Sequence, residues 1–345
     1  MGQITLRDVA NKREPDFNNL LTLLHRGKPE RPTLFEFFQN KKLNEEIAGH
    51  EIPGGEEQIP YVIQTFYTLG YDYTTLLACN FGFPNKAKGH GDVKSISLNS
   101  GAIITDLESY KAYKWPCVAD AYDGRLERFA SYLPEGMKFI VYGPGGVLEN
   151  VIGLMGYENL CMMLYEDPAL VAQIFYDVGS RLRAYYQMII NQDCVGAIIS
   201  NDDWGFNTQT MLSPDDLRRM VFPWHRDIVN VAHNAGKPVI LHSCGQLENV
   251  MDDIIDGIGY DAKHSYEDNI FPVEKAYDIW HDRIAVLGGI DLDFICRKSE
   301  DAIIARSRGL LEQTGCKGYA LGTGNSIPEY VPFNHYYAMI SAAFV

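Results

Sequence analysis

The sequence predicts a single (β/α)8 barrel, an α/β fold, and three observations support this prediction. Eight short apolar segments alternate with longer amphipathic ones, which is typical of parallel strands joined by helices. The length of 345 residues suits one barrel, because such barrels take about 250 residues and more with insertions. No G-x-G-x-x-G follows the first apolar segment, so a dinucleotide-binding sheet lacks its signature. We expect residues 1–345 to form one domain.

The first half of the chain supplies three of the expected strands. An N-terminal extension precedes the first strand, which follows the break at Pro32. After the second strand we expect a hairpin insertion, whose turn falls at Asn99-Ser100-Gly101. The expected elements are a strand at 33–38, a helix at 55–70, a strand at 71–79, the hairpin at 95–109, a helix near 118–132 and a strand at 138–146.

The second half supplies five more strands, each followed by a helix. The helix signals are clear at two places: Asp167-Pro168 opens one helix, and Ser213-Pro214 opens another that stops at Gly236. The expected strands are 196–205, 238–245, 259–267, 284–291 and 318–325; the expected helices are 147–164, 167–191, 213–236, 247–257, 271–281, 299–315 and a short terminal helix.

Composition and charge exclude several classes of protein. A net charge of −15 repels phosphate backbones and anionic lipids, so we expect neither a nucleic acid nor a membrane as partner. No apolar run approaches the roughly 18–20 residues that span a bilayer, and the polar start lacks a signal-peptide core. Seven irregularly spaced cysteines favour free thiols in a reducing compartment. We therefore expect a cytoplasmic protein; a homodimer is left open.

Polar residues gather where the predicted strands end. In such barrels the active site lies at the carboxyl ends of the strands. Seven of the eight strands place polar side chains there, so we expect one active site at that mouth. These residues are Glu36, Tyr142, Asn201, Asp202, Asp203, His242, Cys244, Lys263, His264, Glu267, Asp291 and Asn325.

His242 and Cys244 carry the sharpest signal of a metal site. Residues i and i+2 of a strand point to the same side, so imidazole and thiol can meet on one ion. Both groups are good ligands for Zn²⁺. The structural alternative is a satisfied histidine beside a buried free cysteine. A zinc site also needs at least a third protein ligand.

Carboxylates near this pair offer candidates for that third ligand or for a general base. Asp202 and Asp203 point to opposite sides of their segment, and the alternative role of either is a cap on the following helix. Glu267 and His264 are placed to reach a metal on the fifth strand, although His264 also suits a packed core position. Glu36 stands among phenylalanines, so it is either functional or neutralised by a partner.

Aromatic residues are abundant, and we expect some of them to line the mouth. Phe66, Tyr142 and Trp204 are the examples that the sequence suggests. Such a lining suits a flat, apolar or aromatic ligand.

The order of these landmarks resembles the uroporphyrinogen decarboxylase superfamily over nearly the whole chain. The segments that carry the resemblance are KPERPTLFEFF (28–38), DDWGFNTQTMLSPDDLRRMVFPWHRDIV (202–229), VILHSCG (239–245), AVLGGID (285–291) and ALGTGNSIPEYVPFNHYYAMISAA (320–343). The decarboxylase itself is less similar. Its arginine-rich first-strand segment is absent, LLACNFGF (76–83) lacks its Asp, and its Gly-His-Gly turn reads Gly324-Asn325-Ser326.

The H-x-C-G motif instead resembles the corrinoid-dependent methyltransferase branch. That resemblance implies Zn²⁺ on His242 and Cys244, with a later Cys in coenzyme-M methylases; Asn325 stands at its place. A carboxylate then completes the site, and Glu267 is our expected third ligand, with Asp202 and Asp203 as alternatives. The expected catalytic residues are Asp202, Asp203, Tyr142, Glu36 and Asn325.

The resemblance implies a zinc-dependent methyltransferase of the O-demethylase type. It would move a methyl group from a small methylated substrate, a methoxylated aromatic, to the Co(I) corrinoid (cobalamin) of a partner protein. The chain is too short to carry a corrinoid domain of its own. The alternatives are a methylcobamide:thiol methyltransferase, a uroporphyrinogen-type decarboxylase, and a non-catalytic or corrinoid-binding relative.

Overall fold

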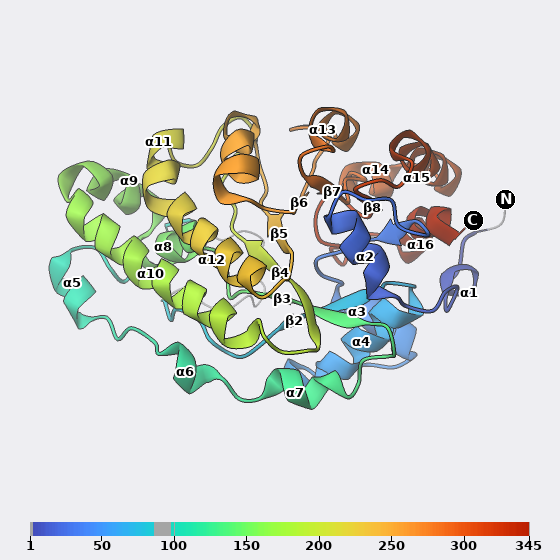
Figure 1. Cartoon of the computed structure of the whole chain (residues 1–345), viewed down its shortest axis with the longest axis horizontal. Coiled ribbons are helices and arrows are strands. Elements are labelled where there is room, and N and C mark those ends of the chain that lie inside the picture. The colour runs from blue at the N-terminus through green and yellow to red at the C-terminus, as the bar shows by residue number, and fades with distance from the viewer. Residues whose placement is uncertain (1–2, 86–97, 100, 345) are drawn as a thin grey trace.

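Eight parallel strands form one sheet that curls at the centre of the molecule (Figure 1). The computed structural model describes residues 3–85, 98–99 and 101–344. The order of the strands is β1-β8-β7-β6-β5-β4-β3-β2, so chain neighbours pair from β2 to β8 and β1 returns to β8. The strands are β1 (Thr33–Leu34), β2 (Tyr73–Leu77), β3 (Lys138–Tyr142), β4 (Val195–Asn201), β5 (Val239–His242), β6 (Ala262–His264), β7 (Ala285–Leu287) and β8 (Tyr319–Leu321).

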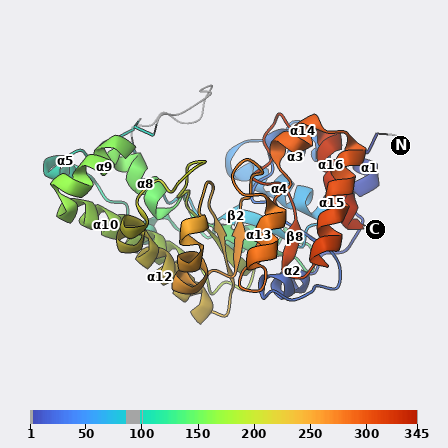
Figure 2. The ribbon, with the colours of Figure 1, turned by 90° about the horizontal axis from the view of Figure 1, so that it is seen from above.

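Helices cover the outside of this sheet, and the predicted fold class is confirmed. In Figure 2, α3, α4 and α13–α16 lie on one side of the strands and α8–α10 with α12 on the other. The helices are α1 (Leu6–Val9), α2 (Phe17–Leu24), α3 (Lys41–Ala48), η1 (Gly55–Gln58), α4 (Ile59–Thr68), α5 (Leu107–Ala112), α6 (Val118–Ala121), α7 (Arg125–Ala130), α8 (Val147–Met155), α9 (Tyr157–Glu166), α10 (Pro168–Ile189), α11 (Pro214–Asp216), η2 (Leu217–Val221), α12 (Phe222–Asn234), η3 (Glu248–Val250), η4 (Asp253–Ile258), α13 (Val273–Trp280), α14 (Leu292–Arg297), α15 (Glu300–Thr314), α16 (Phe333–Ser341) and η5 (Ala342–Phe344).

The seam between β1 and β2 differs from the other strand contacts. Within the described residues no backbone ladder joins these two edges of the sheet. Side-chain hydroxyls connect them instead. The Tyr73 hydroxyl donates to the Glu36 carbonyl and accepts from the Glu36 N–H, both at 2.7 Å. The Thr75 hydroxyl donates to the Phe37 carbonyl at 2.9 Å. The strand expected at 33–38 is therefore short, since hydroxyls rather than backbone groups of β2 bind its second half.

Two other expectations differ from the structure. Residues 95–97 and 100 of the expected hairpin at 95–109 lie outside the described residues, and 107–109 begin α5 instead of a strand. The helix expected at 213–236 contains the π-helical turn η2 before α12. Pro223 at the start of α12 has no N–H to donate, which interrupts the regular α-helical bonding there.

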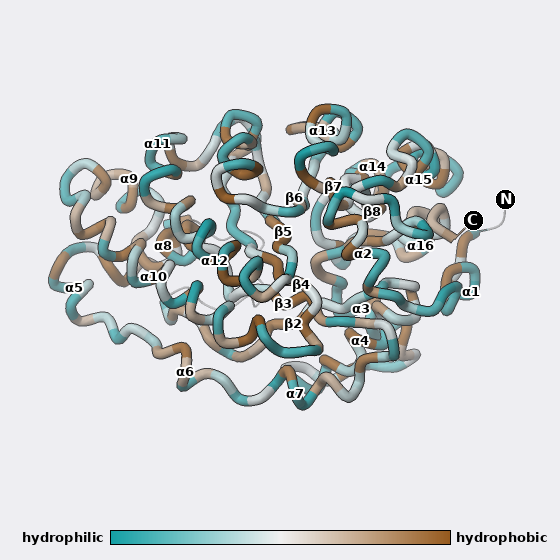
Figure 3. The backbone as a smooth tube through the Cα atoms, in the orientation of Figure 1, coloured by the Kyte–Doolittle hydropathy of each residue, from teal (hydrophilic) through white to brown (hydrophobic). Residues whose placement is uncertain are grey.

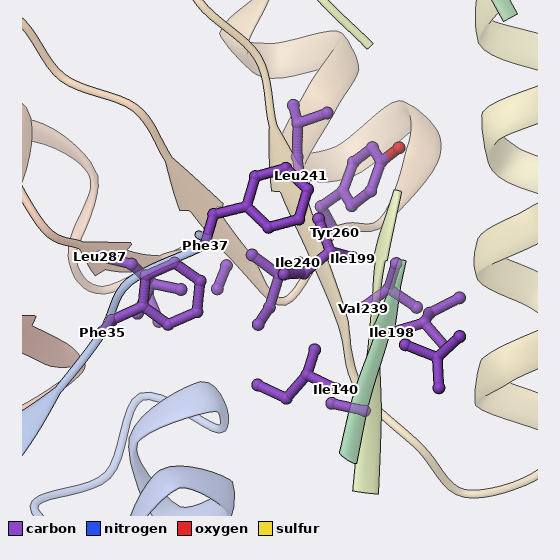
Figure 4. Packing of buried hydrophobic residues seen from close by; sticks show 14 of the residues in the cluster. Phe35, Phe37, Ile140, Ile198, Ile199, Val239, Ile240, Leu241, Tyr260 and Leu287 are labelled. Atoms are coloured by element: carbon purple, nitrogen blue, oxygen red, sulfur yellow. The ribbon is translucent and has the colours of Figure 1, made fainter. Parts of the chain in front are cut away.

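The core lies between the sheet and its helices and inside the curl of the strands. Figure 3 shows hydrophobic segments along the central strands and alternating character along the surrounding helices. Figure 4 shows Phe35 and Phe37, which follow β1, in one buried cluster with Ile140, Ile240 and Leu287. The rings after β1 thus fill the interior at the seam. Across the described part of the chain, no helix is long and apolar enough to cross a membrane.

Candidate metal centre

Three side chains at the carboxyl ends of β4 and β5 form a cluster that could hold a metal ion. His242 is the last residue of β5, Cys244 follows two residues later, and Asp203 follows β4. One ligand atom of each residue lies within 4.8 Å of the others. Among the described residues, this is the group of His, Cys, Asp or Glu side chains that is close enough together to hold a metal ion. The His242 Nε2 and Cys244 Sγ atoms are 3.8 Å apart. The two residues singled out by their spacing therefore do converge.

Close backbone approach brings Asp203 to this pair. Gly205 and Gly245 touch: a Cβ on Gly205 would lie 2.8 Å from the carbonyl carbon of Gly245. The Gln246 N–H donates to the Phe206 carbonyl at 2.8 Å, which fixes the two loops side by side. Asp203 Oδ1 then accepts the Cys244 N–H at 2.8 Å. One carboxylate oxygen is held by the backbone, and the other remains for a metal.

A chain of hydrogen bonds orients the His242 ring. Its Nδ1 lies 2.8 Å from Nδ1 of His264, and Nε2 of His264 lies 3.2 Å from the Thr323 carbonyl. A carbonyl only accepts, so we assign the His264 proton to Nε2. His264 Nδ1 is then an acceptor, and His242 donates to it from Nδ1. This leaves a lone pair on His242 Nε2, the atom that faces Cys244.

Burial keeps both imidazoles neutral. It lowers the pKa of His242 to about 3, with a further contribution from Lys263, and it lowers the pKa of His264 strongly. A neutral imidazole is the form that binds metal ions, and an N–H donated to a second group is the usual support of such a ligand.

Asn325 and Ser265 surround the sulfur of Cys244. Asn325 Nδ2 lies 3.3 Å from Sγ, and the thiol donates to Ser265 Oγ at 3.5 Å. Burial and the nearby Asp203 raise the pKa of Cys244 to about 12. A thiolate here needs a cation, and an amide N–H directed at the sulfur favours the same ionised form.

The donor set fits zinc. Tetrahedral Zn²⁺ with bonds of about 2.0 Å to nitrogen and 2.3 Å to sulfur places these atoms about 3.5 Å apart. The observed separation of His242 Nε2 and Cys244 Sγ, 3.8 Å, is close to this value. Nitrogen, sulfur and carboxylate oxygen are the three zinc donors of proteins, and three protein ligands leave the fourth position for a substrate.

Comparisons with known proteins agree with this architecture. The model of the uroporphyrinogen decarboxylase (URO-D) family matches residues 139–344, well over half of the chain. The chain belongs to this family. No curated protein sequence matches it.

Solved structures similar to this URO-D family member include a methyltransferase from Methanosarcina mazei. The two share 16% sequence identity at a TM-score of 0.68, over 96% of this chain and 98% of that chain, which shows a common fold. A structure from Listeria monocytogenes, named for a vitamin-B12-independent methionine synthase, shares 12% identity at a TM-score of 0.49, over 95% and 98% of the two chains.

The carboxylates of Asp202 and Glu267, which were also expected near the metal, do not belong to the cluster of three in this URO-D family chain. Asp202 is buried and accepts the N–H groups of Leu148 and Glu149 at 2.8 and 2.9 Å, at the start of α8. It also lies 2.9 Å from Nε2 of His225 on α12. Asp202 therefore caps α8, which lies earlier in the sequence, and not the helix that follows Asp202. Glu267 lies outside the cluster of three; its Oε1 is 3.4 Å from Asn325 Nδ2.

Glu36 is buried and binds Thr323, the residue whose carbonyl accepts a hydrogen bond from His264. Its two oxygens accept the N–H and the hydroxyl of Thr323 at 2.8 and 2.6 Å. Burial raises the pKa of Glu36 to about 8, although both hydrogen bonds oppose this shift. Glu36, Thr323, His264 and His242 thus form one connected series that ends at the candidate metal.

An aromatic wall leads from the cluster to Tyr142. The ring of Phe37 lies 4.8 Å from that of His242 and 5.3 Å from that of Tyr142. Phe66 and Trp204 are fully buried elsewhere, against Tyr71 and Phe222 respectively, so the expectation that they line the mouth is wrong.

The structure also reveals groups that the sequence did not single out as functional. Glu149 lies beside Asp202 and Asp203, and burial with these two charges raises its pKa to about 8. Ser265 has φ +149°, a conformation that residues other than glycine rarely adopt. Lys263, noted only for its position at a strand end, is buried and donates to the Ser265 carbonyl at 2.7 Å; burial lowers its pKa to about 8. Of these three residues only Glu149 has a recognisable sequence signal: it stands three residues after Gly146, the spacing of a capping box at the start of a helix.

Proposed function

We propose that this chain is a zinc-dependent methyltransferase. It would move a methyl group from a small methylated substrate, a methoxylated aromatic, to the Co(I) corrinoid of a partner protein. The observation that supports this best is the cluster of Asp203, His242 and Cys244 at the mouth of a URO-D family barrel. The similarity in fold to a methyltransferase from Methanosarcina mazei is consistent with the proposal. We treat residues 1–345 as one domain.

Each residue of the site then has a defined task. Asp203, His242 and Cys244 would hold zinc, His264 sets the tautomer of His242, and Asn325 donates an N–H toward the sulfur. When bound, zinc would supply Lewis-acid stabilisation of the oxygen on which charge develops as the methyl–oxygen bond breaks. The electron pair of that bond stays with the oxygen, which leaves as the phenol after taking up a proton.

The walls of the site position the substrate. The partly exposed ring of Tyr142 presents a flat apolar surface, backed by the buried ring of Phe37 beside His242, against which an aromatic ether can lie with its oxygen toward the metal. Glu36 acts through Thr323 and His264 as a positioning residue. The Asp202 carboxylate positions α8 and α12 and is not one of the three ligand groups, while its backbone N–H donates to the His242 carbonyl at 3.0 Å.

Metal analysis and a methyl-transfer assay test the proposal together. The wild type, Cys244→Ala and Cys117→Ala are compared; Cys117 is exposed and distant in sequence from the site. We expect one equivalent of zinc and release of phenol from a methoxylated aromatic with reduced cobalamin in the wild type and in Cys117→Ala. Both should be lost in Cys244→Ala.

Two results would contradict the proposal. One is full methyl transfer by metal-free Cys244→Ala. The other is equal decarboxylation of uroporphyrinogen by the wild type and Cys244→Ala, which would assign the chain the decarboxylase activity for which its family is named.

A further inference from the structure

A cavity of about 370 Å³ lies at the seam between the two edges of the sheet. Residues of the segment that follows β1, of β2 and of the end of β3 line it, together with parts of α3, η1, α4 and α7. In the described part of the chain no backbone ladder joins β1 to β2, so side chains and not backbone bonds define the width of the cavity. Its volume falls in the range of about 300–1,000 Å³ that small-molecule sites occupy. A single substituted ring fits it, whereas a tetrapyrrole does not.

Aromatic rings connect this seam cavity to the candidate metal centre. Phe38 and Tyr142 both line the cavity, and their rings meet edge to face with centroids 4.9 Å apart. Tyr142 in turn contacts Phe37, whose ring lies against His242. Two rings in succession, Tyr142 and then Phe37, therefore lie between a ligand in the cavity and His242. Ile59 and Val62 of α4 add apolar surface on the opposite wall.

Arg125 lines the seam cavity and has an unused donor. It is 3% exposed; Nη1 donates to the Leu77 carbonyl at 3.0 Å, and Nη2 donates to Glu56 Oε1 and Asn80 Oδ1 at 2.6 and 2.7 Å. Its Nε is buried and has no hydrogen-bond partner in the described structure. Asn44, 2% exposed and also lining the cavity, has an unpartnered Oδ1. A buried donor without an acceptor costs free energy, and a ligand oxygen would relieve it.

The charge around Arg125 is already balanced. Glu56 accepts from Arg125 with one oxygen and from Arg128 with the other, and Asp123 lies 3.6 Å from both guanidinium groups. The unpaired Nε–H of Arg125 therefore needs a hydrogen-bond acceptor, and the acceptor does not have to carry a negative charge. A carboxylate and a neutral carbonyl both meet this need.

We propose that the seam cavity binds the part of the methyl donor that is remote from its methyl group, and that Arg125 selects aromatic ethers with an acceptor oxygen on the ring. The ring lies against Phe38 and Tyr142, the acceptor oxygen faces Arg125, and the ether points past Tyr142 toward His242. This proposal rests on the proposed function, but binding in the cavity requires neither zinc nor a corrinoid.

Calorimetric binding to the wild type and to Cys244→Ala tests it apart from the chemistry. The probes are 4-methoxybenzoate, 4-methoxybenzamide and 4-methylanisole, which lacks the acceptor oxygen. We expect the benzoate and the benzamide to bind about tenfold more tightly than 4-methylanisole, in both proteins alike. Tighter binding of the benzoate alone would show that negative charge, and not an acceptor oxygen, is selected, and would contradict the proposal. Equal binding of all three probes would overturn the proposal.

Two variants locate the binding in the seam cavity. Arg125→Lys removes the Nε–H, and we expect it to abolish the preference for an acceptor oxygen. Because Arg125 also anchors Leu77, Val62→Phe provides a second probe: it fills the cavity and should reduce binding of every probe at least tenfold. Ile279→Phe adds the same ring at an exposed position of α13 and should change nothing. Unchanged affinity in Val62→Phe would place the ligand elsewhere.

Discussion

The Nδ1 atoms of His242 and His264 face each other at 2.8 Å, so one imidazole donates to the other inside the barrel. The Thr323 carbonyl accepts from the far side of His264 and thereby decides the direction of both hydrogen bonds. The nitrogen of His242 that faces Cys244 is consequently free of a proton before any metal arrives. His264, which is not itself one of the three candidate ligands, thus determines the form of the ligand His242.

Replacing His264 should weaken zinc binding without removing a ligand. His264→Phe keeps a ring against Phe35 but loses the acceptor for His242 Nδ1. We expect the zinc dissociation constant to rise about 10- to 100-fold, as measured by competition with a chromophoric chelator. His264→Asn can return an acceptor oxygen near the Nδ1 position and should recover part of the loss. The ¹⁵N spectrum of His242 should show an Nδ1–H tautomer in the wild type and a mixture in His264→Phe. An unchanged spectrum and affinity would rule out this positioning role.

The neighbouring residues Asp202 and Asp203 should respond to the same change in opposite ways. Asp203→Asn should weaken zinc binding at least tenfold but leave the unfolding free energy of the zinc-free protein equal or higher, because burial already raises the pKa of Asp203. Asp202→Asn should retain zinc but lower that free energy by about 2 kcal/mol, since it disturbs a cap and a buried hydrogen bond to His225. Urea denaturation and chelator competition on both variants check this. Zinc loss in Asp202→Asn at normal stability would reverse the assignment.

The ionisation of Glu36 should make stability depend on pH. Its pKa is raised from 4.5 to about 8, so the folded chain retains a proton that the unfolded chain releases between these values. This contribution is fully present below pH 4.5 and is lost as pH rises through 8, amounting to about 5 kcal/mol at most. Glu36→Gln cannot ionise and can still bond to Thr323. We expect urea denaturation to show a stability difference that grows in favour of Glu36→Gln from pH 5 to pH 8.

A surface variant separates this effect from general titration. Glu329 is about half exposed and pairs with Lys42, so Glu329→Gln should follow the wild-type pH profile. Parallel profiles for the wild type and Glu36→Gln would show that Glu36 ionises normally in the folded chain.

Gly205→Ala tests the contact between the loops after β4 and β5. The added methyl group would lie 2.7 Å from the Gln246 nitrogen and would push the loops apart. We expect Asp203 to move away from the Cys244 N–H and zinc affinity to fall at least tenfold, measured by chelator competition. Gly309→Ala is the matched control: nothing lies within 4 Å of its added methyl, and in the middle of α15 it should raise stability by about 0.5–1 kcal/mol. Normal zinc affinity in Gly205→Ala would show that this close approach is dispensable.

Hydrophobic pattern sufficed to predict the strands but not all helices. All eight expected strands are present, because a strand buried on both faces reads as a short apolar run. The expected elements did not include α2 and α3, although Asp16 and Asn40 cap them, because both are short: α2 lies in the N-terminal extension and α3 between the first strand and the helix expected at 55–70. The shortened β1 could not be predicted, since it depends on where the hydroxyls of Tyr73 and Thr75 fall in the fold.

In the candidate site, too, one part could be predicted from the sequence and another could not. The pair His242 and Cys244 could be found from a two-residue spacing, which strand geometry converts directly into proximity. The choice among Asp202, Asp203 and Glu267 could not be made, because it depends on the contact between Gly205 and Gly245, residues far apart in sequence. The role of Asp202 as a cap was recognised as an alternative, but its helix, α8, lies more than 50 residues earlier.

The seam between β1 and β2 also has a consequence for how such barrels diversify. Across a backbone ladder the spacing of two strands is the same whatever the sequence, since every residue offers the same groups. Here the spacing depends on Tyr73 and Thr75, and a single codon change at either position alters it. Descendants of one ancestral barrel can therefore widen or narrow the seam cavity beside the candidate metal centre while the seven strand pairs joined by backbone ladders stay in register.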